Sequence, residues 1–152
     1  MLINMVGKTA LVTGGSRGIG RAIAMRFAEC GARVAINYVR NTAAAEETAK
    51  MIRKAGGDAL ILRANLAKPD KVAEMFVQLR EEWGDTLDFL VSNAATGVIK
   101  PALELTEHHW NWTMSLNAGT LLPLIQNARP MMKEGGSVVA VSSLGALRAI
   151  PM

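Results

Sequence analysis

The stretch Thr13–Gly20, TGGSRGIG, lies between an apolar segment and a helical pattern, and its glycines Gly14, Gly18 and Gly20 follow a GxxxGxG spacing. Glycine permits a positive φ in a tight turn, and its missing side chain allows the main chain to approach a phosphate closely. The amino terminus of the following helix would add unpaired amides that bind an anion. Glycines also occur in purely structural turns, but a strand before and a helix after this one favour a turn that binds a dinucleotide.

Outward from this turn, apolar segments alternate with helical patterns, which is typical of repeated strand–helix–strand units and a parallel sheet. The patterns predict strands over 9–13, 33–38, 59–63, 87–92 and 137–142. They predict helices from the glycine turn to Cys30, from a cap at Thr42 to about 55, from Pro69 through Trp83, and over 107–132, with a kink at Pro123. The buried stripes expected are Ile19, Ile23 and Phe27 in the first helix and Val72, Met75, Phe76, Leu79 and Trp83 in the third.

Length and composition indicate one globular α/β domain over residues 1–152, with half of the residues hydrophobic and a fifth charged. No apolar run is long enough for a membrane span and no signal peptide is evident, so a cytoplasmic protein without a membrane partner is expected. Cys30 is the only cysteine, which excludes an internal disulfide and a cysteine-rich metal site. The adjacent histidines His108 and His109 cannot share a helix face, so no metal site is predicted.

The positive charge lies at the front of the chain, where residues 1–58 hold nine Lys or Arg against four acids. No basic run or interleaved aromatic pattern accompanies it, so a small phosphate-bearing ligand is favoured over nucleic acid. The end of the second strand, INYVRN at 36–41, lacks the acid that NAD enzymes place there for the ribose hydroxyls. Arg40 and Arg17 could instead bind a 2′-phosphate, which favours NADPH. Ser16, Ile19 and Tyr38 are further candidate cofactor contacts.

At this point the sequence resembles the short-chain dehydrogenase/reductase family. The resemblance rests on TGGSRGIG at 13–20, NAATG at 93–97, Asn117 within MSLNAG, and VSS at 141–143. It implies an oxidoreductase with a Rossmann-like, doubly wound parallel sheet, of which this chain holds the first five strands with their helices and lacks the last strands. The site residues that it implies are Asn65 and Leu66 beside the adenine, Asn93, Ala94 and Ala95 against the cofactor, Asn117 at a helix kink with a relay water, and Ser143 on the substrate's reacting oxygen.

Within that family, the segment 93–119 and the loop SSLGALR at 142–148 look most like NADPH-dependent enoyl-acyl carrier protein reductases of the bacterial type III group. That resemblance implies hydride transfer to a trans-2-enoyl thioester in fatty-acid synthesis, an acyl carrier protein as the carrier, and a homo-oligomer. The rival 3-oxoacyl carrier protein reductases share the same cofactor half. Ser92 stands where many relatives have a second asparagine, and the early Gly145 leaves open whether Ser142 or Ser143 faces the substrate.

The family also needs a tyrosine and a lysine shortly beyond the serine, because a phenol with a pKa near 10 works near neutral pH only beside a cation. The only tyrosine in these 152 residues is Tyr38, at the wrong end. The chain is therefore interpreted as ending before the proton donor. It is either part of a complete reductase or a nucleotide-binding module without turnover, and by itself it is expected to bind cofactor at most.

Overall fold

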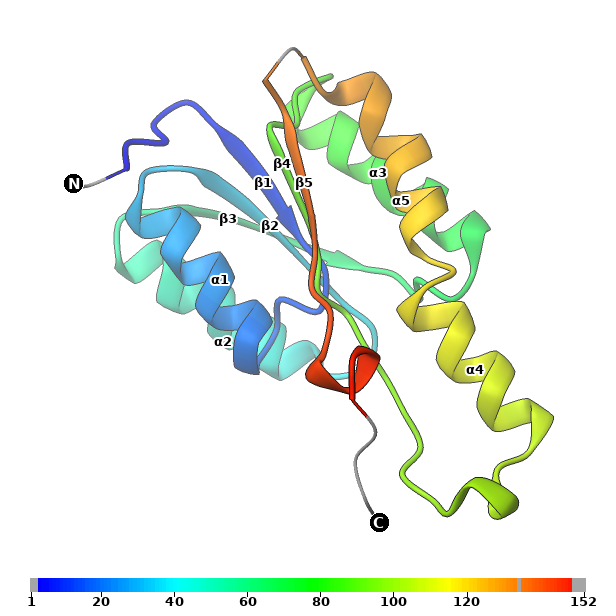
Figure 1. Ribbon diagram of the computed structural model, residues 1–152. Helices are drawn as coiled ribbons and strands as arrows, with labels where there is room; N and C mark the ends of the chain where they lie inside the picture. The colour runs from blue at the N-terminus through cyan, green and yellow to red at the C-terminus, as the bar shows by residue number, and fades with distance from the viewer. Residues whose placement is uncertain (1–2, 134, 149–152) are drawn as a thin grey trace.

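The computed structural model describes residues 3–133 and 135–148, which form a parallel sheet of five strands with helices on both faces (Figure 1). The strand order is β3-β2-β1-β4-β5, and each neighbouring pair is parallel. The strands are β1 (Thr9–Val12), β2 (Arg33–Tyr38), β3 (Asp58–Arg63), β4 (Phe89–Ser92) and β5 (Ser137–Ala140). The predicted Rossmann-like α/β fold is confirmed, and each predicted strand lies within two residues of its observed bounds.

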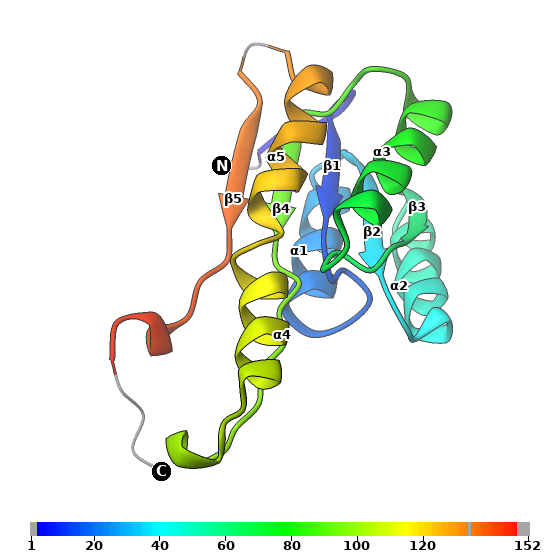
Figure 2. The same cartoon turned by 90° about the vertical axis from the view of Figure 1, so that its right-hand side faces the viewer.

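Five α-helices connect or flank these strands: α1 (Gly18–Glu29), α2 (Thr42–Lys54), α3 (Pro69–Trp83), α4 (Glu107–Asn117) and α5 (Leu121–Ala128). Helices α1 and α2 cover one face of the sheet, and α3 and α5 cover the other (Figures 1 and 2). Each face has its own apolar core. Strand β2 serves both, because Val34 and Ile36 point toward α1 and α2 while Ala35 points toward α3.

The predicted helix boundaries agree closely for α1 and α3. Helix α1 ends at Glu29 with Cys30 as its C-cap, and Gly31 follows with φ +94, as a C-terminal glycine should. Pro69 occupies the first turn of α3, and all five residues of its predicted stripe are buried. Ordinary helix periodicity therefore accounts for the packing of α3 on the sheet.

The stripe predicted for α1 is correct only in part, because Ile23 and Phe27 are half-buried against the core whereas Ile19 is not. Ile19 is 66% exposed, and the residues that α1 buries are Gly20, Ala24 and Ala28. Small side chains let the helix lie close to the strand. At residue 20 the approach is closest, since a Cβ there would lie 2.2 Å from the carbonyl oxygen of Gly14.

Two other details of the helices differ from expectation. The cap of α2 is Asn41 and not Thr42, because the Asn41 side chain accepts a hydrogen bond from the Ala44 amide at 3.0 Å. The helix predicted over 107–132 is interrupted at 118–120, and the short 3₁₀ helix η2 (Arg129–Met131) follows α5. Pro123 lies in the first turn of α5, where its missing amide removes no helical hydrogen bond, so the break precedes the proline.

The edge of the sheet that β5 forms is exposed to solvent. All four residues of the edge strand β5 are exposed, and Trp110 and Trp112 of α4 are exposed as well. Two more short 3₁₀ helices, η1 (Ala102–Glu104) and η3 (Leu144–Ala146), lie in the loops beyond β4 and β5. None of the helices in the described ranges is sufficiently long and apolar to cross a bilayer.

The amino ends of β1 and β4 are joined by one carboxylate. Asp88 accepts hydrogen bonds from the Thr9 amide and the Lys8 ammonium, both at 2.9 Å. Partial burial opposes ionisation of Asp88, but the hydrogen bonds from Lys8 and Thr9 outweigh it and hold the pKa of this carboxyl below its ordinary value. The contribution of Asp88 to stability is therefore complete above the unfolded pKa and is lost as pH falls through the folded value.

We expect Asp88→Asn to lower the free energy of unfolding by about 1–2 kcal/mol at pH 7, because the charged acceptor of two hydrogen bonds is lost. The difference from the wild type should shrink at pH 3, which lies below the ordinary pKa of an Asp carboxyl, because Asp88 then binds more protons in the unfolded chain than in the folded one. Urea unfolding at the two pH values measures it. Glu81→Gln, at an exposed position of α3, is the control and should change little. An Asp88→Asn deficit that grows on acidification would contradict this assignment.

We expect Gly20→Ala to lower the free energy of unfolding by about 1–3 kcal/mol, because the new methyl group overlaps the Gly14 carbonyl and forces α1 away from the turn. Gly97→Ala is the matched control, since its Cβ meets no atom within 4 Å and its φ is not positive. Chemical denaturation measures both variants. Equal stability of the two would show that α1 does not depend on this contact.

Candidate cofactor site

The loops that follow the strands meet at the carboxyl edge of the sheet, and Thr13 joins two of them. Its buried hydroxyl accepts hydrogen bonds from the amides of Asn93 at 2.9 Å and Ala94 at 3.0 Å. The Asn93 side chain returns a hydrogen bond to the Thr13 carbonyl at 2.9 Å. The glycine turn after β1 and the loop after β4 are thus one rigid unit, which includes the predicted residues Asn93 and Ala94, while Ala95 beyond them is exposed.

The glycine turn has the backbone that its sequence predicts. Gly14 and Gly18 have φ values of +62 and +54, which other residues rarely adopt. A Cβ on Gly14 would lie 3.0 Å from the Cα of Ala94, whereas nothing lies within 4 Å of the Cβ position of Gly18. The space beside Gly18 at the start of α1 is therefore open to a ligand.

The amino terminus of α1 is suited to an anion. Its N-cap, Arg17, forms no side-chain cap, and the first turn holds no acid. The helix dipole and the free amides of this turn, near Ser16 and Ile19, therefore attract negative charge without competition from a carboxylate. The residues present fit the pyrophosphate of a dinucleotide.

A hydrogen-bond network that the sequence did not reveal joins the glycine turn to residues of α1 and α2. The Ser16 carbonyl accepts hydrogen bonds from the Arg21 guanidinium at 3.0 Å and from the Thr48 hydroxyl at 2.9 Å. Arg21 also donates to Thr48 at 2.8 Å and pairs with Glu47 at 2.7 Å. No sequence spacing points to this network, because its members come from two helices that only the fold brings together.

The two arginines assigned to a 2′-phosphate lie on the surface. Arg17 and Arg40 are exposed, and within residues 3–133 and 135–148 neither forms an ion pair. Tyr38, in contrast, is buried among the residues under α1 and α2, with its hydroxyl 3.2 Å from that of Thr42. Tyr38 is thus a core residue and is not placed to donate a proton to a substrate.

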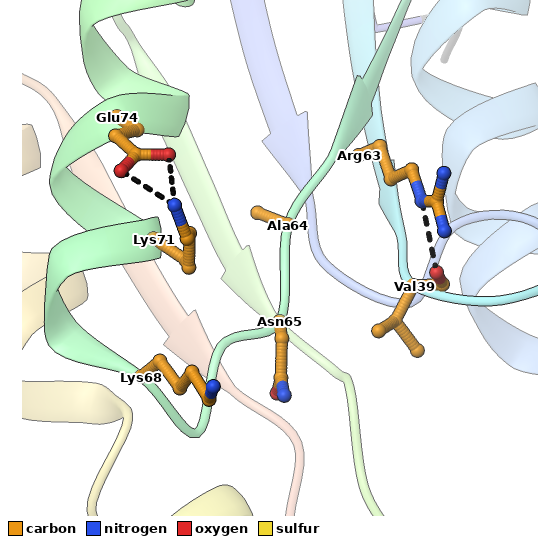
Figure 3. A pocket seen from close by; sticks show the side chains of 7 residues that line it. All are labelled: Val39, Arg63, Ala64, Asn65, Lys68, Lys71 and Glu74. Carbon is orange, nitrogen blue, oxygen red and sulfur yellow. Dashed lines mark hydrogen bonds and ion pairs between the residues drawn. The ribbon is translucent and has the colours of Figure 1, made fainter.

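A pocket of about 370 Å³ lies beyond the carboxyl ends of β2 and β3 (Figure 3). Arg63 donates to the Val39 carbonyl at 3.3 Å, and Lys71 pairs with Glu74 at 2.6 Å. The pocket is lined by Val39, Arg63, Ala64, Asn65, Lys68, Lys71 and Glu74. It is therefore a predominantly basic pocket, which suits a phosphate.

Asn65 and Leu66, both assigned to the adenine, have different surroundings. Asn65 lines the basic pocket and is exposed, with its side-chain oxygen accepting from the Ala67 amide at 3.1 Å. Leu66 is only 4% exposed and packs in the core beneath α3. Its side chain therefore cannot form a wall of an adenine site, and only its backbone is left for the predicted contact.

Asn117, the last residue of α4, ties that helix to the loop after β4. Its side chain accepts from the Thr96 amide and donates to the Thr96 carbonyl, both at 2.8 Å. The helix is interrupted directly after it, as the resemblance implies. The amide of Asn117 thus positions the loop that begins at Asn93.

The serines of VSS follow the carboxyl end of β5, where the chain turns into η3. Ser143 is exposed and accepts from the Gly145 amide at 3.1 Å, and Ser142 is exposed beside it. The Ser143 hydroxyl proton is free to be donated elsewhere, because this hydrogen bond uses the oxygen as acceptor. In the described part of the chain, no cluster of three His, Cys, Asp or Glu side chains could hold a metal.

Comparisons with known proteins agree with this geometry. The family model described as Enoyl-(Acyl carrier protein) reductase matches residues 14–152. The chain is 36% identical over 143 residues to hydroxynaphthalene reductase-like protein Arp2 of Metarhizium majus. The aligned region covers 94% of this chain and 53% of the relative. The chain is 35% identical over 144 residues to 1-cyclohexenylcarbonyl-CoA reductase of Streptomyces collinus, where the aligned region covers 95% and 51%.

Among solved structures, the landomycin C-6 ketoreductase LanV with bound NADP and rabelomycin matches with a TM-score of 0.90 and 40% identity, over 97% of this chain and 62% of that one. The chain spans about half the length of the curated relatives that it matches. The glycine turn, the Asn93 loop and these matches together show that the chain belongs to the short-chain dehydrogenase/reductase family.

Proposed function

We propose that this chain is the NADPH-binding part of a short-chain reductase. The observation that carries the proposal is the open glycine turn at the start of α1. Arg17 is exposed within this turn, Arg40 is exposed just after β2, and no acid stands at the end of β2. Each hydrogen bond from an arginine to a phosphate contributes about 1.5–3 kcal/mol. Two such bonds at the 2′-phosphate would favour NADPH over NADH. The basic pocket that Asn65 lines is a second observation in favour of a phosphate at the adenosine end of the cofactor.

Bound NADPH would supply a hydride, and the residues of this chain would bind and orient the reactants. The amides at the start of α1 would hold the pyrophosphate, and the Thr13–Asn93 network would fix the loop that faces the cofactor. Ser143 would donate a hydrogen bond to the reacting oxygen of the substrate. Since the only tyrosine is buried against Thr42, we propose that these 152 residues bind cofactor without turnover.

For the substrate of the whole protein, we propose a trans-2-enoyl thioester carried by an acyl carrier protein in fatty-acid synthesis. The segment 93–119 and the description of the matching family model support this assignment. Reduction of a ketone, as in 3-oxoacyl carrier protein reductases, is the second candidate. It is favoured by the name of LanV, which is a ketoreductase.

We also propose that the whole protein is a cytoplasmic homo-oligomer. Large apolar side chains lie exposed on α4 and α5, including Trp110, Leu122 and Ile125. An exposed apolar surface of this kind on helices is typical of an interface between subunits.

We expect the 152-residue chain to bind NADPH saturably in a fluorescence titration and to bind NADH at least about tenfold more weakly. Arg17→Ala and Arg40→Ala should each weaken NADPH binding by about tenfold and leave NADH binding nearly unchanged, because NADH lacks the 2′-phosphate. Arg26→Ala, which removes a charge near the other end of α1, controls for net charge. Absence of saturation would refute the cofactor assignment, and equal losses for both cofactors would refute the role of the arginines.

A protein of the relatives' length that includes this chain should oxidise NADPH with a crotonyl thioester and much more slowly with an acetoacetyl thioester. The reverse order would assign ketone reduction instead. The 152-residue chain assayed alongside should show no turnover with either substrate. Turnover by this chain would contradict the proposal that it lacks a proton donor.

A further inference from the structure

We infer that Asn37 is a positioning residue that sets the separation between the two ends of the cofactor site. Asn37 lies near the carboxyl end of β2, which is between β1 and β3 in the sheet, and is 2% exposed. A buried polar side chain in a parallel strand is costly unless its groups are hydrogen-bonded, and an apolar residue would serve the strand as well. The amide of Asn37 therefore calls for an explanation beyond the sheet itself.

The hydrogen bonds of Asn37 reach the segments after β1 and β3. Its side-chain nitrogen donates to the Ala64 carbonyl at 3.1 Å and lies 3.4 Å from the carbonyls of Leu62 and Tyr38. Its side-chain oxygen accepts a long bond of 3.5 Å from the Gly14 amide. Its backbone carbonyl accepts from the Gly15 amide at 3.0 Å.

These contacts make Asn37 a bridge between two loops of the site. On one side are Gly14 and Gly15, which begin the turn that would bind the pyrophosphate. On the other side is Ala64, which precedes Asn65 and lines the basic pocket. One rigid amide thus fixes the start of the glycine turn relative to the segment at which an adenosine would end.

This inference rests on the proposed function. When two parts of one ligand bind at two subsites, the second contact is effectively intramolecular, and its advantage depends on correct spacing. Loss of the bridge should leave each subsite able to bind its own fragment. It should weaken the whole cofactor, because the two subsites no longer keep the spacing that the cofactor requires.

The experiment compares Asn37→Leu with the wild type for three ligands, at a temperature well below both unfolding midpoints. Inorganic pyrophosphate probes the glycine turn, adenosine 2′-monophosphate probes the adenosine end, and NADPH spans both. We expect the fragment dissociation constants, from NMR titrations, to change by less than about twofold. The NADPH dissociation constant should rise about tenfold or more.

Thr120→Val is the matched control, because it also removes a buried polar group. The Thr120 hydroxyl donates to the Leu116 carbonyl at 2.8 Å and contacts neither loop of the site among the residues that the structure describes. This variant should lower the unfolding midpoint without changing NADPH affinity. If Asn37→Leu does not fold, Asn37→Ser, which is small and polar, is judged by the same criteria. Retention of NADPH affinity, a loss matched by Thr120→Val, or parallel losses for fragments and cofactor would each overturn the role of Asn37.

The wild-type titrations separate this inference from the proposed function. Failure of the wild type to bind NADPH would contradict the proposed function and the inference with it. Binding by the wild type with no effect of Asn37→Leu would contradict the inference alone.

Discussion

The close approach of α1 to the turn that precedes it is the constraint on which the site depends. A side chain at residue 20 would overlap the Gly14 carbonyl and would lie 2.6 Å from the side-chain nitrogen of Asn93. Because Gly20 leaves that space empty, the helix begins directly beneath the turn, and Asn93 reaches the backbone of Thr13. Both the position of the uncapped start of α1 and the rigid loop after β4 follow from this one contact.

The amino ends and the carboxyl ends of the strands have different roles. At the amino ends, Asp88 joins β1 to β4 and contributes to stability. At the carboxyl ends, the strand order reverses between β1 and β4, and open sheets of this kind bind ligands at such a reversal. The glycine turn and the Asn93 loop follow these two strands, so the topology itself places the candidate site there.

Local patterns predicted most of this fold. Alternation of strand and helix predicted the sheet, the helical spacing of apolar residues predicted the core face of α3, and Gly31 marked the end of α1. Local patterns failed where a neighbour decides the outcome. Ile19 fits a helical stripe, yet Gly20 faces the sheet because the turn leaves room only for glycine. Pro123 was expected to kink the helix, but a proline in a first turn breaks nothing, and the break follows Asn117, where the resemblance implied a kink.

The glycines of the turn and Asn93 in the loop after β4 could be predicted from the sequence, since their spacing reflects local backbone geometry. Arg21 and Asn37 were missed. Their partners are the Ser16 and Ala64 carbonyls, and backbone acceptors leave no trace in the residue pattern. Candidate ligand-binding residues are therefore easier to predict from a sequence than the residues that position them.

Amide chemical shifts of the ¹⁵N-labelled chain during titration with NADP⁺ would locate the cofactor site. Saturable shifts should be concentrated at Gly14–Gly20 and Asn93–Ala95, with further shifts near Asn65. The amides of Thr9 and Asp88, at the opposite end of the sheet, should not move. Shifts centred on that opposite end, or no saturable shift in the glycine turn, would contradict the assignment of this edge as the cofactor site.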